Sequence, residues 1–302
     1  MAKLQESCNI LYHWEKDVGL PREEFLSMGK GIEGLFCTLT DKINSEFLDK
    51  AESLKVISTM SVGFDHIDLP ECTKRNIKVG NTPGVLTEST ADHVLAILLA
   101  TARRLPEASM AVKEGKWPSS WIPLWMCGKD VHGSTVGIIG MGRIGLAVAK
   151  RLTGFGCRIL YTGNKEKPND VGAKFVSMDE LLKESDFVVP LCPLNKSTEK
   201  LINRDAFKKM KNDAILINVS RGAVVDQEAL LDALKNGEIG ACGLDVTVPE
   251  PLPVDHLLLD PSLADKVVII PHIASATTAT RTAMSVIAAD NLIKALNNQP
   301  MI

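Results

Sequence analysis

The sequence has few of the features that mark metal-binding or membrane proteins. None of its seven cysteines forms a Cys-x-x-Cys pair, and most lie in apolar runs where a thiol behaves as a small core residue. We therefore predict no metal site and a reducing compartment, with the cytosol as the default. No apolar run approaches bilayer thickness, and the opening residues MAKLQESCNILYHWEK contain no signal-peptide core. The sequence thus predicts no contact with a membrane.

A basic tail or stripe is also absent. The 34 basic and 37 acidic residues are scattered along the chain and give a net charge of −3, which argues against nucleic acid as a partner. A length of 302 residues with 45% hydrophobic and 24% charged residues is typical of a globular protein with room for two domains.

Short β-rich apolar runs alternate with helical patterns, which predicts α/β architecture with parallel sheets. Two longer helical patterns, at 87–104 and 277–297, divide this array and are the expected crossings between two domains. The predicted strands are 35–39, 55–60, 78–81, 135–139, 158–162, 187–190, 214–219, 240–245 and 267–270.

The segment STVGIIGMGRIGLAVAKRL is the strongest local signal. A predicted strand runs into Gly140-Met141-Gly142-Arg143-Ile144-Gly145, and a helix follows. Gly140 permits a tight turn, Gly142 lets the backbone approach a pyrophosphate, and Gly145 brings helix and strand together. The positive end of the helix dipole would then face the anion, so we predict a dinucleotide site.

The end of the next strand indicates the type of dinucleotide. An NAD site usually places Asp or Glu there for the ribose hydroxyls, whereas this strand closes with Gly163-Asn164-Lys165. Without a carboxylate to repel it, a 2′-phosphate could pair with Lys165 and Lys167. The sequence favours NADP over NAD, although a solvated lysine turn with no ligand is the alternative.

Three polar residues lie at or beyond the ends of neighbouring predicted strands. Reduction of a 2-oxo acid needs a cation for the substrate carboxylate and a proton donor for the carbonyl oxygen, and Arg221 and His272 match these roles. Glu250 could orient the imidazole and stabilise its protonated form. Each residue alone has an ordinary structural explanation: a surface ion pair, a loop charge and a core or capping histidine.

The loop from Lys116 to Gly133 carries Trp117, Trp121 and Trp125 at intervals of four. Aromatic side chains on a long loop usually mark an interface. The alternative is that they cover the core of their own domain.

Together these residues resemble the D-2-hydroxyacid dehydrogenase family, and within it the animal glyoxylate/hydroxypyruvate reductases most closely. The similarity covers nearly the whole chain, and the motifs in combination are highly specific. The matching stretches are LKVISTMSVGFDHIDL, RRLPEA, PLWMCG, STVGIIGMGRIG, LYTG, INVSRGAVV, GLDVTVPEPLP and PHIASAT.

This resemblance implies two Rossmann-like doubly wound domains, with a dinucleotide-binding domain at 86–277 inserted into a flavodoxin-like substrate domain at 1–85 and 278–302. It implies the same catalytic set of Arg221, Glu250 and His272. It adds the backbone of Val62 and Gly63, together with Ser275, as substrate-binding groups. Further cofactor contacts are implied at Pro193, Val219, Asp245 and Ala274.

The resemblance also implies a homodimer through the cofactor domains, in which Trp121 borders the active site of the partner. The insertion WPSSW leaves the register of Trp121 open. Relative to the family, the chain begins within or after the first helix, so the opening strand is missing, and we expect Asn9 to Trp14 to form the first strand.

We therefore predict an enzyme that reduces hydroxypyruvate or glyoxylate to D-glycerate or glycolate with NADPH, NAD being a second possibility for the cofactor. A dinucleotide sensor resembling a corepressor is the alternative from another class. A phosphoglycerate dehydrogenase is the alternative among enzymes.

Overall fold

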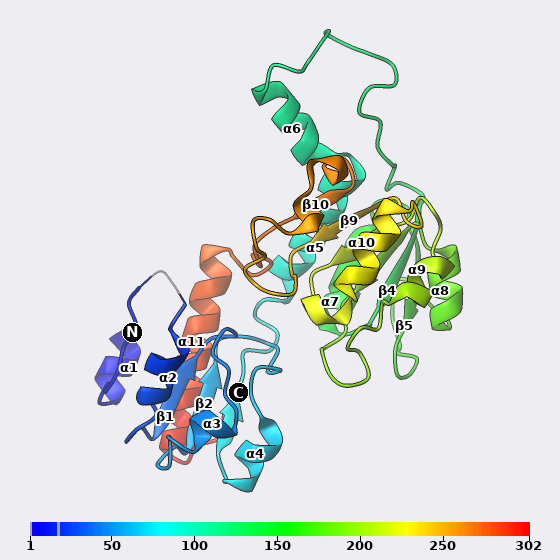
Figure 1. Ribbon diagram of the computed structural model, residues 1–302. Helices are drawn as coiled ribbons and strands as arrows, with labels where there is room; N and C mark the ends of the chain where they lie inside the picture. The colour runs from blue at the N-terminus through cyan, green and yellow to red at the C-terminus, as the bar shows by residue number, and fades with distance from the viewer. Residues whose placement is uncertain (1, 17–18) are drawn as a thin grey trace. The chain divides into compact units, whose positions relative to one another are not determined.

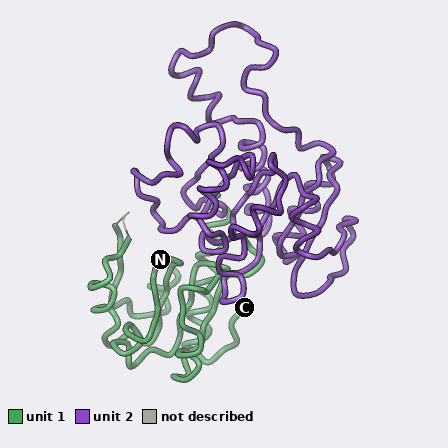
Figure 2. The backbone as a smooth tube through the Cα atoms, turned by 45° about the vertical axis from the view of Figure 1, so that its right-hand side comes forward, with its two compact units in different colours: residues 1–86, 276–302 green, residues 87–275 purple. Residues whose placement is uncertain are grey.

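The computed structural model describes residues 2–16 and 19–302. The chain divides into two compact units: unit 1 comprises Met1–Leu86 and Ala276–Ile302, and unit 2 comprises Thr87–Ser275 (Figure 2). The two long helices begin directly after the two boundaries, with α5 at Thr87–Ala102 and α11 at Thr278–Leu296. Unit 2 is thus inserted into the sequence of unit 1.

Unit 2 is built around a seven-stranded parallel sheet with the order β10-β9-β8-β7-β4-β5-β6. The chain moves outward from β4 through β5 to β6, returns to β7 on the other side of β4, and continues to β10, which is a doubly wound order. Its strands are β4 Thr135–Ile139, β5 Arg158–Thr162, β6 Lys174–Phe175, β7 Phe187–Pro190, β8 Ile215–Asn218, β9 Ala241–Leu244 and β10 Val267–Ile269.

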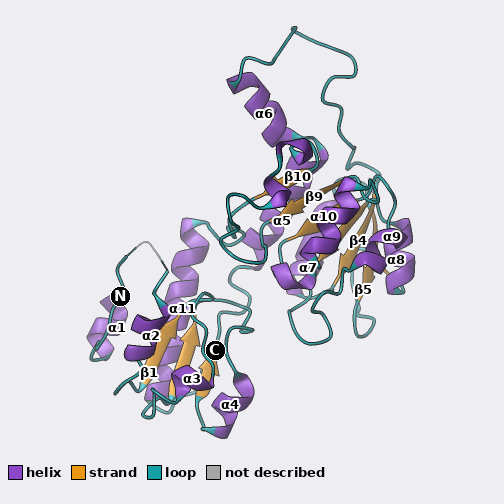
Figure 3. Cartoon of the chain, viewed as in Figure 1, coloured by secondary structure: helices purple, strands orange, loops and turns teal. Residues whose placement is uncertain are grey.

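Helices cover both faces of this sheet, as Figure 3 shows. One apolar core joins α5 and α7 to the sheet, and another joins it to α8, α9 and α10. Alternate side chains of one strand enter opposite cores, with Ile138 in the first and Ile139 in the second. The helices not yet given are α6 Leu105–Lys113, α7 Arg143–Thr153, α8 Met178–Glu184, α9 Arg204–Lys209 and α10 Gln227–Lys235, with 3₁₀ turns at Gly222–Val224, Leu257–Leu259 and Pro261–Leu263.

A charged cluster closes the amino-terminal edge of this sheet. Asp186, just before β7, accepts a hydrogen bond from the Thr135 amide at 2.8 Å and pairs with Lys211 at 2.9 Å and Lys129 at 3.2 Å. Burial raises the pKa of the Asp186 carboxyl, but these donors outweigh burial and leave the pKa below its usual value. The carboxylate therefore stabilises the fold in its charged form.

Unit 1 contains a three-stranded parallel sheet in the order β1-β2-β3. In Figure 1, α11 lies along one face of this sheet, and Leu4 of α1 belongs to the apolar core between them. Helices α2 and α3 cover the other face. The elements are α1 Ala2–Ser7, α2 Arg22–Ser27, β1 Gly34–Cys37, α3 Ser45–Leu48, β2 Val56–Thr59, α4 Leu69–Lys74 and β3 Lys78–Gly80.

The prediction of parallel α/β architecture is confirmed, and each of the nine predicted strands overlaps an observed strand. The strand expected from Asn9 to Trp14 is wrong: these residues form neither helix nor strand. Leu11 is 52% exposed and Tyr12 47% exposed, so the segment pairs with no sheet edge and buries no alternating face. The short strand β6 was not predicted, because two residues carry no periodicity.

Candidate functional site

The glycine turn lies where the order of strands reverses in unit 2, the usual position of a dinucleotide crevice. Gly140 follows β4 with a φ of +105°, and a Cβ there would lie 2.9 Å from the Cys192 amide nitrogen after β7. A Cβ on Gly145 would lie 2.4 Å from the Gly140 carbonyl oxygen, so α7 approaches the strand closely. Both positions therefore require glycine.

Gly142 differs, because a Cβ there would meet nothing within 4 Å. It caps α7, whose first residues Arg143 and Ile144 present backbone amides at the positive end of the helix dipole. An open backbone at the start of an eleven-residue helix is a suitable cradle for a pyrophosphate. The residues present therefore fit a dinucleotide.

The loop after β5 carries the residues predicted to select NADP. Asn164, Lys165 and Lys167 are all exposed, and Glu166, Lys167, Pro168 and Asn169 line a pocket of about 490 Å³. The buried Tyr161 fixes this loop, since its hydroxyl accepts a hydrogen bond from the Lys167 amide and donates one to the Lys167 carbonyl, each at 2.9 Å.

The three predicted catalytic residues follow three adjacent strands, β8, β9 and β10. Arg221 is half-buried, and its carbonyl accepts a hydrogen bond from the Asn218 side chain at 2.9 Å. A Cβ on Gly222 would lie 2.1 Å from the Thr247 carbonyl oxygen. The Arg221 turn therefore packs directly against the segment that leads to Glu250.

The predicted pair of Glu250 and His272 is present. His272 Nδ1 lies 2.8 Å from Glu250 Oε2, and the other oxygen of Glu250 accepts a hydrogen bond from the Thr247 amide at 3.1 Å. The side chains are 25% and 35% exposed, respectively. An imidazole held at Nδ1 by an accessible carboxylate keeps Nε2 for proton transfer.

Asp245, just after β9, connects several parts of this site. Its fully buried side chain accepts hydrogen bonds from the amides of Ile273 at 2.8 Å and Ala274 at 3.1 Å, and from His93 Nε2 on α5 at 3.1 Å. Burial raises the pKa of the Asp245 carboxyl, but the His93 and amide hydrogen bonds outweigh it and hold the pKa below its usual value. The carboxylate has no exposed surface, and its hydrogen bonds fix the turn that carries Ala274.

The other predicted residues of unit 2 follow the same strand ends. Pro193 is exposed after β7, Val219 is 7% exposed after β8, and Ser275 is half-buried beyond β10. Trp121 lies on the long loop after α6 and is 76% exposed. The sequence did not identify His93 or Tyr161, because a single histidine in a helix and a single tyrosine in a strand carry no pattern.

In unit 1, Val62 and Gly63 follow β2. The Val62 carbonyl accepts a hydrogen bond from the Asn81 side chain at 2.8 Å, and the Gly63 carbonyl accepts one from the Ser61 hydroxyl at 2.7 Å. Within residues 2–16 and 19–302, the two amides donate to no other residue. Two fixed peptide groups with available N–H donors suit a carboxylate.

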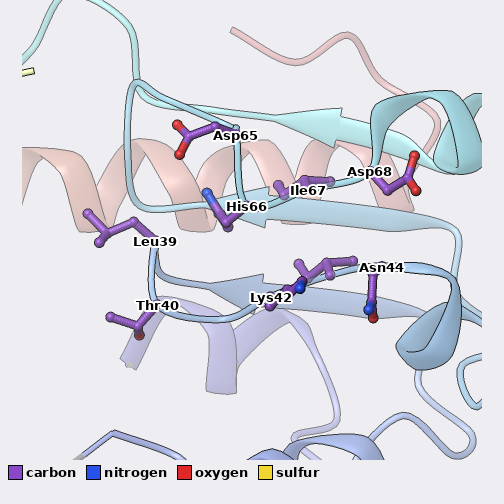
Figure 4. A pocket seen from close by; sticks show the side chains of 9 residues that line it. Leu39, Thr40, Lys42, Asn44, Asp65, His66, Ile67 and Asp68 are labelled. Atoms are coloured by element: carbon purple, nitrogen blue, oxygen red, sulfur yellow. The ribbon is translucent and has the colours of Figure 1, made fainter. Parts of the chain in front are cut away.

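A pocket of about 410 Å³ lies next to this turn in unit 1. Figure 4 shows side chains from the loops after β1 and β2 around it, among them Thr40, Lys42 and His66. It contains none of the predicted site residues, and we assign it no role.

Two further kinds of feature are absent from the described part of the chain. No helix there combines the length and apolar character needed to cross a bilayer. No group of three or more histidine, cysteine, aspartate or glutamate side chains there could hold a metal ion.

Comparison with known proteins identifies the family. Residues 95–274 match the model described as D-isomer specific 2-hydroxyacid dehydrogenase, NAD binding domain. The chain is 51% identical over 293 residues to the glyoxylate reductase/hydroxypyruvate reductase of Homo sapiens, covering 95% of this chain and 88% of that protein.

Two solved structures support the same relationship. The TT0316 protein of Thermus thermophilus has a TM-score of 0.91 and 45% identity, covering 99% of this chain and 93% of that one. The NADPH-dependent glyoxylate/hydroxypyruvate reductase of Sinorhizobium meliloti, in complex with NADP and malonate, has a TM-score of 0.81 and 36% identity, covering 88% and 81%. With its nucleotide-binding turn and its paired histidine and glutamate, this chain belongs to the D-isomer specific 2-hydroxyacid dehydrogenase family, whose members are oxidoreductases that use a nicotinamide cofactor.

Proposed function

We propose that the chain reduces glyoxylate and hydroxypyruvate to glycolate and D-glycerate with NADPH. The observation that carries the proposal is the 2.8 Å pair of His272 and Glu250 beyond the ends of β10 and β9. The names of the human relative and of the Sinorhizobium meliloti reductase support the substrates, and the NADP in the latter supports the cofactor. The sensor-like alternative is not favoured, because such a protein has no need of an oriented acid.

When bound, the reduced nicotinamide supplies hydride to the 2-oxo carbon. Glu250 accepts the Nδ1–H of His272, which orients the ring and leaves Nε2–H to protonate the substrate oxygen. Arg221 is assigned to the substrate carboxylate, which its guanidinium can bind with two parallel hydrogen bonds. We assign the amides of Val62 and Gly63, as well as Ser275, to substrate binding.

The first test mixes the purified chain with NADPH and a panel of 2-oxo acids and follows NADPH absorbance. We expect His272→Ala to keep NADPH binding and to lose reduction by about 100- to 10,000-fold, the usual contribution of a general acid. His132→Ala, an exposed histidine of the same unit, is the matched control. Unchanged turnover in His272→Ala would reject the assigned acid, and NADPH binding without turnover in the wild type would favour the sensor.

The preference for NADPH over NADH is a separate part of the proposal. It rests on the exposed Lys165 and Lys167 and on the lack of a carboxylate at the end of β5. The double variant Lys165→Ala, Lys167→Ala should lose about 10- to 100-fold in kcat/KM with NADPH, since each charged hydrogen bond contributes about 1.5–3 kcal/mol and these are exposed. Activity with NADH should change little, and Lys174→Ala is the matched control. Equal losses with both cofactors would refute the assignment.

We also propose a homodimer formed through unit 2. Figure 1 shows α6 and the following loop extending away from the sheet of unit 2. Trp117 is 55% exposed, Leu124 85% and Met110 51%, so these side chains do not cover the core of their own unit. Burying such apolar surface in a second copy is favourable, and we assign Trp121 to the border of the partner's active site.

Sedimentation equilibrium tests the dimer. Leu124→Glu should shift the chain to monomer, while Val254→Glu, at an even more exposed apolar residue on another loop, should not. A monomeric wild type, or a dimer that tolerates Leu124→Glu, would exclude this interface. The cytosol stays a prediction from the sequence.

A further inference from the structure

The turn that carries His272 adopts an unusual backbone conformation. His272 has a φ of +50°, in the left-handed region that residues other than glycine rarely occupy. Such a conformation costs on the order of 1–3 kcal/mol and persists only where surrounding contacts fix it. The contacts at this turn therefore show which residues hold His272 in position.

Asp245 supplies most of these contacts. Its backbone carbonyl accepts a hydrogen bond from the His272 amide at 2.8 Å. Its carboxylate accepts the next two amides of the chain, those of Ile273 and Ala274. Three successive amides thus point to one aspartate.

A buried carboxylate keeps this geometry only if its charge and direction are fixed. His93 Nε2, on α5, contacts Asp245 Oδ1 at 3.1 Å, and the His93 side chain is only 14% exposed. It is the one side-chain donor to this carboxylate within the described residues. Because α5 packs against β8, β9 and β10, His93 is held on a rigid element.

We propose that His93 is a positioning residue for the general acid: through Asp245 it holds the turn at 272–274 so that the His272 ring faces Glu250. His93 itself acts on the turn and does not touch the substrate. The expected effect on kinetics rests on the proposed function. The clamp itself, by which we mean the contacts from His93 through Asp245 to the turn at 272–274, is a property of the fold.

Two amide variants of His93 test whether the side chain must be long enough to donate a hydrogen bond to Asp245. Gln places its Nε2 at about the position of the imidazole Nε2, whereas Asn is one methylene shorter. We expect His93→Asn to lower kcat for glyoxylate reduction by about 10- to 100-fold, corresponding to about 1.4–2.7 kcal/mol. The KM for NADPH should change less than about threefold, and His93→Gln should restore most of kcat.

A control separates positioning from loss of stability. Val94→Ala removes two methyl groups from the core beside His93 without touching the turn. It should lower the melting temperature and leave kcat unchanged. If Val94→Ala loses kcat in proportion to its melting temperature, or if His93→Asn and His93→Gln have the same kcat, positioning is refuted.

Hydrogen exchange provides a readout that does not depend on activity. The amides of Ile273 and Ala274 should be protected in the wild type and in His93→Gln, and should exchange at least about tenfold faster in His93→Asn. If the wild type fails to oxidise NADPH with any 2-oxo acid, the proposed function fails while exchange still decides the clamp. Unchanged protection in His93→Asn would overturn the proposal.

Discussion

Replacing Gly142 by alanine separates binding of the cofactor from stability of the fold. Gly142 has φ −83° and ψ −165°, in the extended region open to any residue, and a Cβ would meet no atom within 4 Å. The substitution therefore strains nothing in the free protein. Fewer conformations of the unfolded chain favour the variant by about 0.4–1 kcal/mol, while alanine is a poorer N-cap of α7 by about 0.5–1 kcal/mol, so the free energy of unfolding should change little.

The same methyl group should weaken NADPH binding. It occupies the open side of the turn, where the pyrophosphate is expected to meet backbone amides. Loss of one charge-assisted hydrogen bond costs about 1.5–3 kcal/mol. This corresponds to a Kd about 10- to 150-fold higher.

Gly145→Ala is the contrasting change in the same turn. Its Cβ would lie 2.4 Å from the Gly140 carbonyl oxygen, so α7 must move away from β4. Overpacking of this kind costs about 1–3 kcal/mol, and the better helix propensity of alanine returns only about 1 kcal/mol. We expect a net loss of up to about 2 kcal/mol, which lowers Tm by up to ~8 °C.

The measurements are thermal unfolding without ligand and a fluorescence titration with NADPH. The reasoning predicts a stable Gly142→Ala that binds poorly and a Gly145→Ala that melts early. Wild-type affinity in Gly142→Ala would show that the pyrophosphate does not approach this position. A Gly142→Ala that melts below Gly145→Ala would show that the backbone there is not open.

Three other substitutions test parts of unit 2. Asp186→Asn should lower the free energy of unfolding by about 1–2 kcal/mol. Because the pKa of Asp186 is lowered in the folded state, this difference should be complete above the ordinary aspartate pKa near 4 and should vanish as pH falls through the folded pKa. Urea unfolding measured across pH tests this. Tyr161→Phe removes both hydrogen bonds to Lys167, so the KM for NADPH should rise several-fold while kcat holds, and an unchanged KM would refute the role of the loop. The Gln227 side chain hydrogen-bonds both backbone groups of Val248, in the segment that leads to Glu250. Gln227→Ala should therefore lower kcat without changing the Kd for NADPH. A wild-type kcat in steady-state kinetics would refute this role of Gln227.

Most of unit 2 could be predicted from its sequence, because each of its signals is local. The three glycines each show a constraint of their own backbone: a positive φ at Gly140, an open side at Gly142 and a close approach at Gly145. The buried strands are apolar runs bounded by turns, and the predicted ends agree with the observed ones within two residues. The paired His272 and Glu250 were predicted from their chemistry and from the family pattern.

The segment Asn9 to Trp14 shows why local preference can fail. Ile10 and Tyr12 favour a strand, but a strand also needs a neighbouring edge. The sheet of unit 1 keeps an outer edge on β1 and another on β3, yet within the described residues the segment pairs with neither. Propensity alone cannot show whether a segment docks on an edge.

The clamp of His93 and Asp245 on the turn at 272–274 could not be predicted from the sequence, for a different physical reason. His93 and Asp245 are 152 residues apart, and what joins them is the packing of α5 on the sheet rather than any spacing along the chain. The left-handed backbone at His272 gives no signal either, because histidine carries no intrinsic preference strong enough to select it. The residues that perform chemistry can be recognised by their type, whereas the residues that place them depend on how helices and strands meet. Substitutions that reduce activity without contacting a ligand should therefore concentrate at such meeting points, and His93 is the first to test.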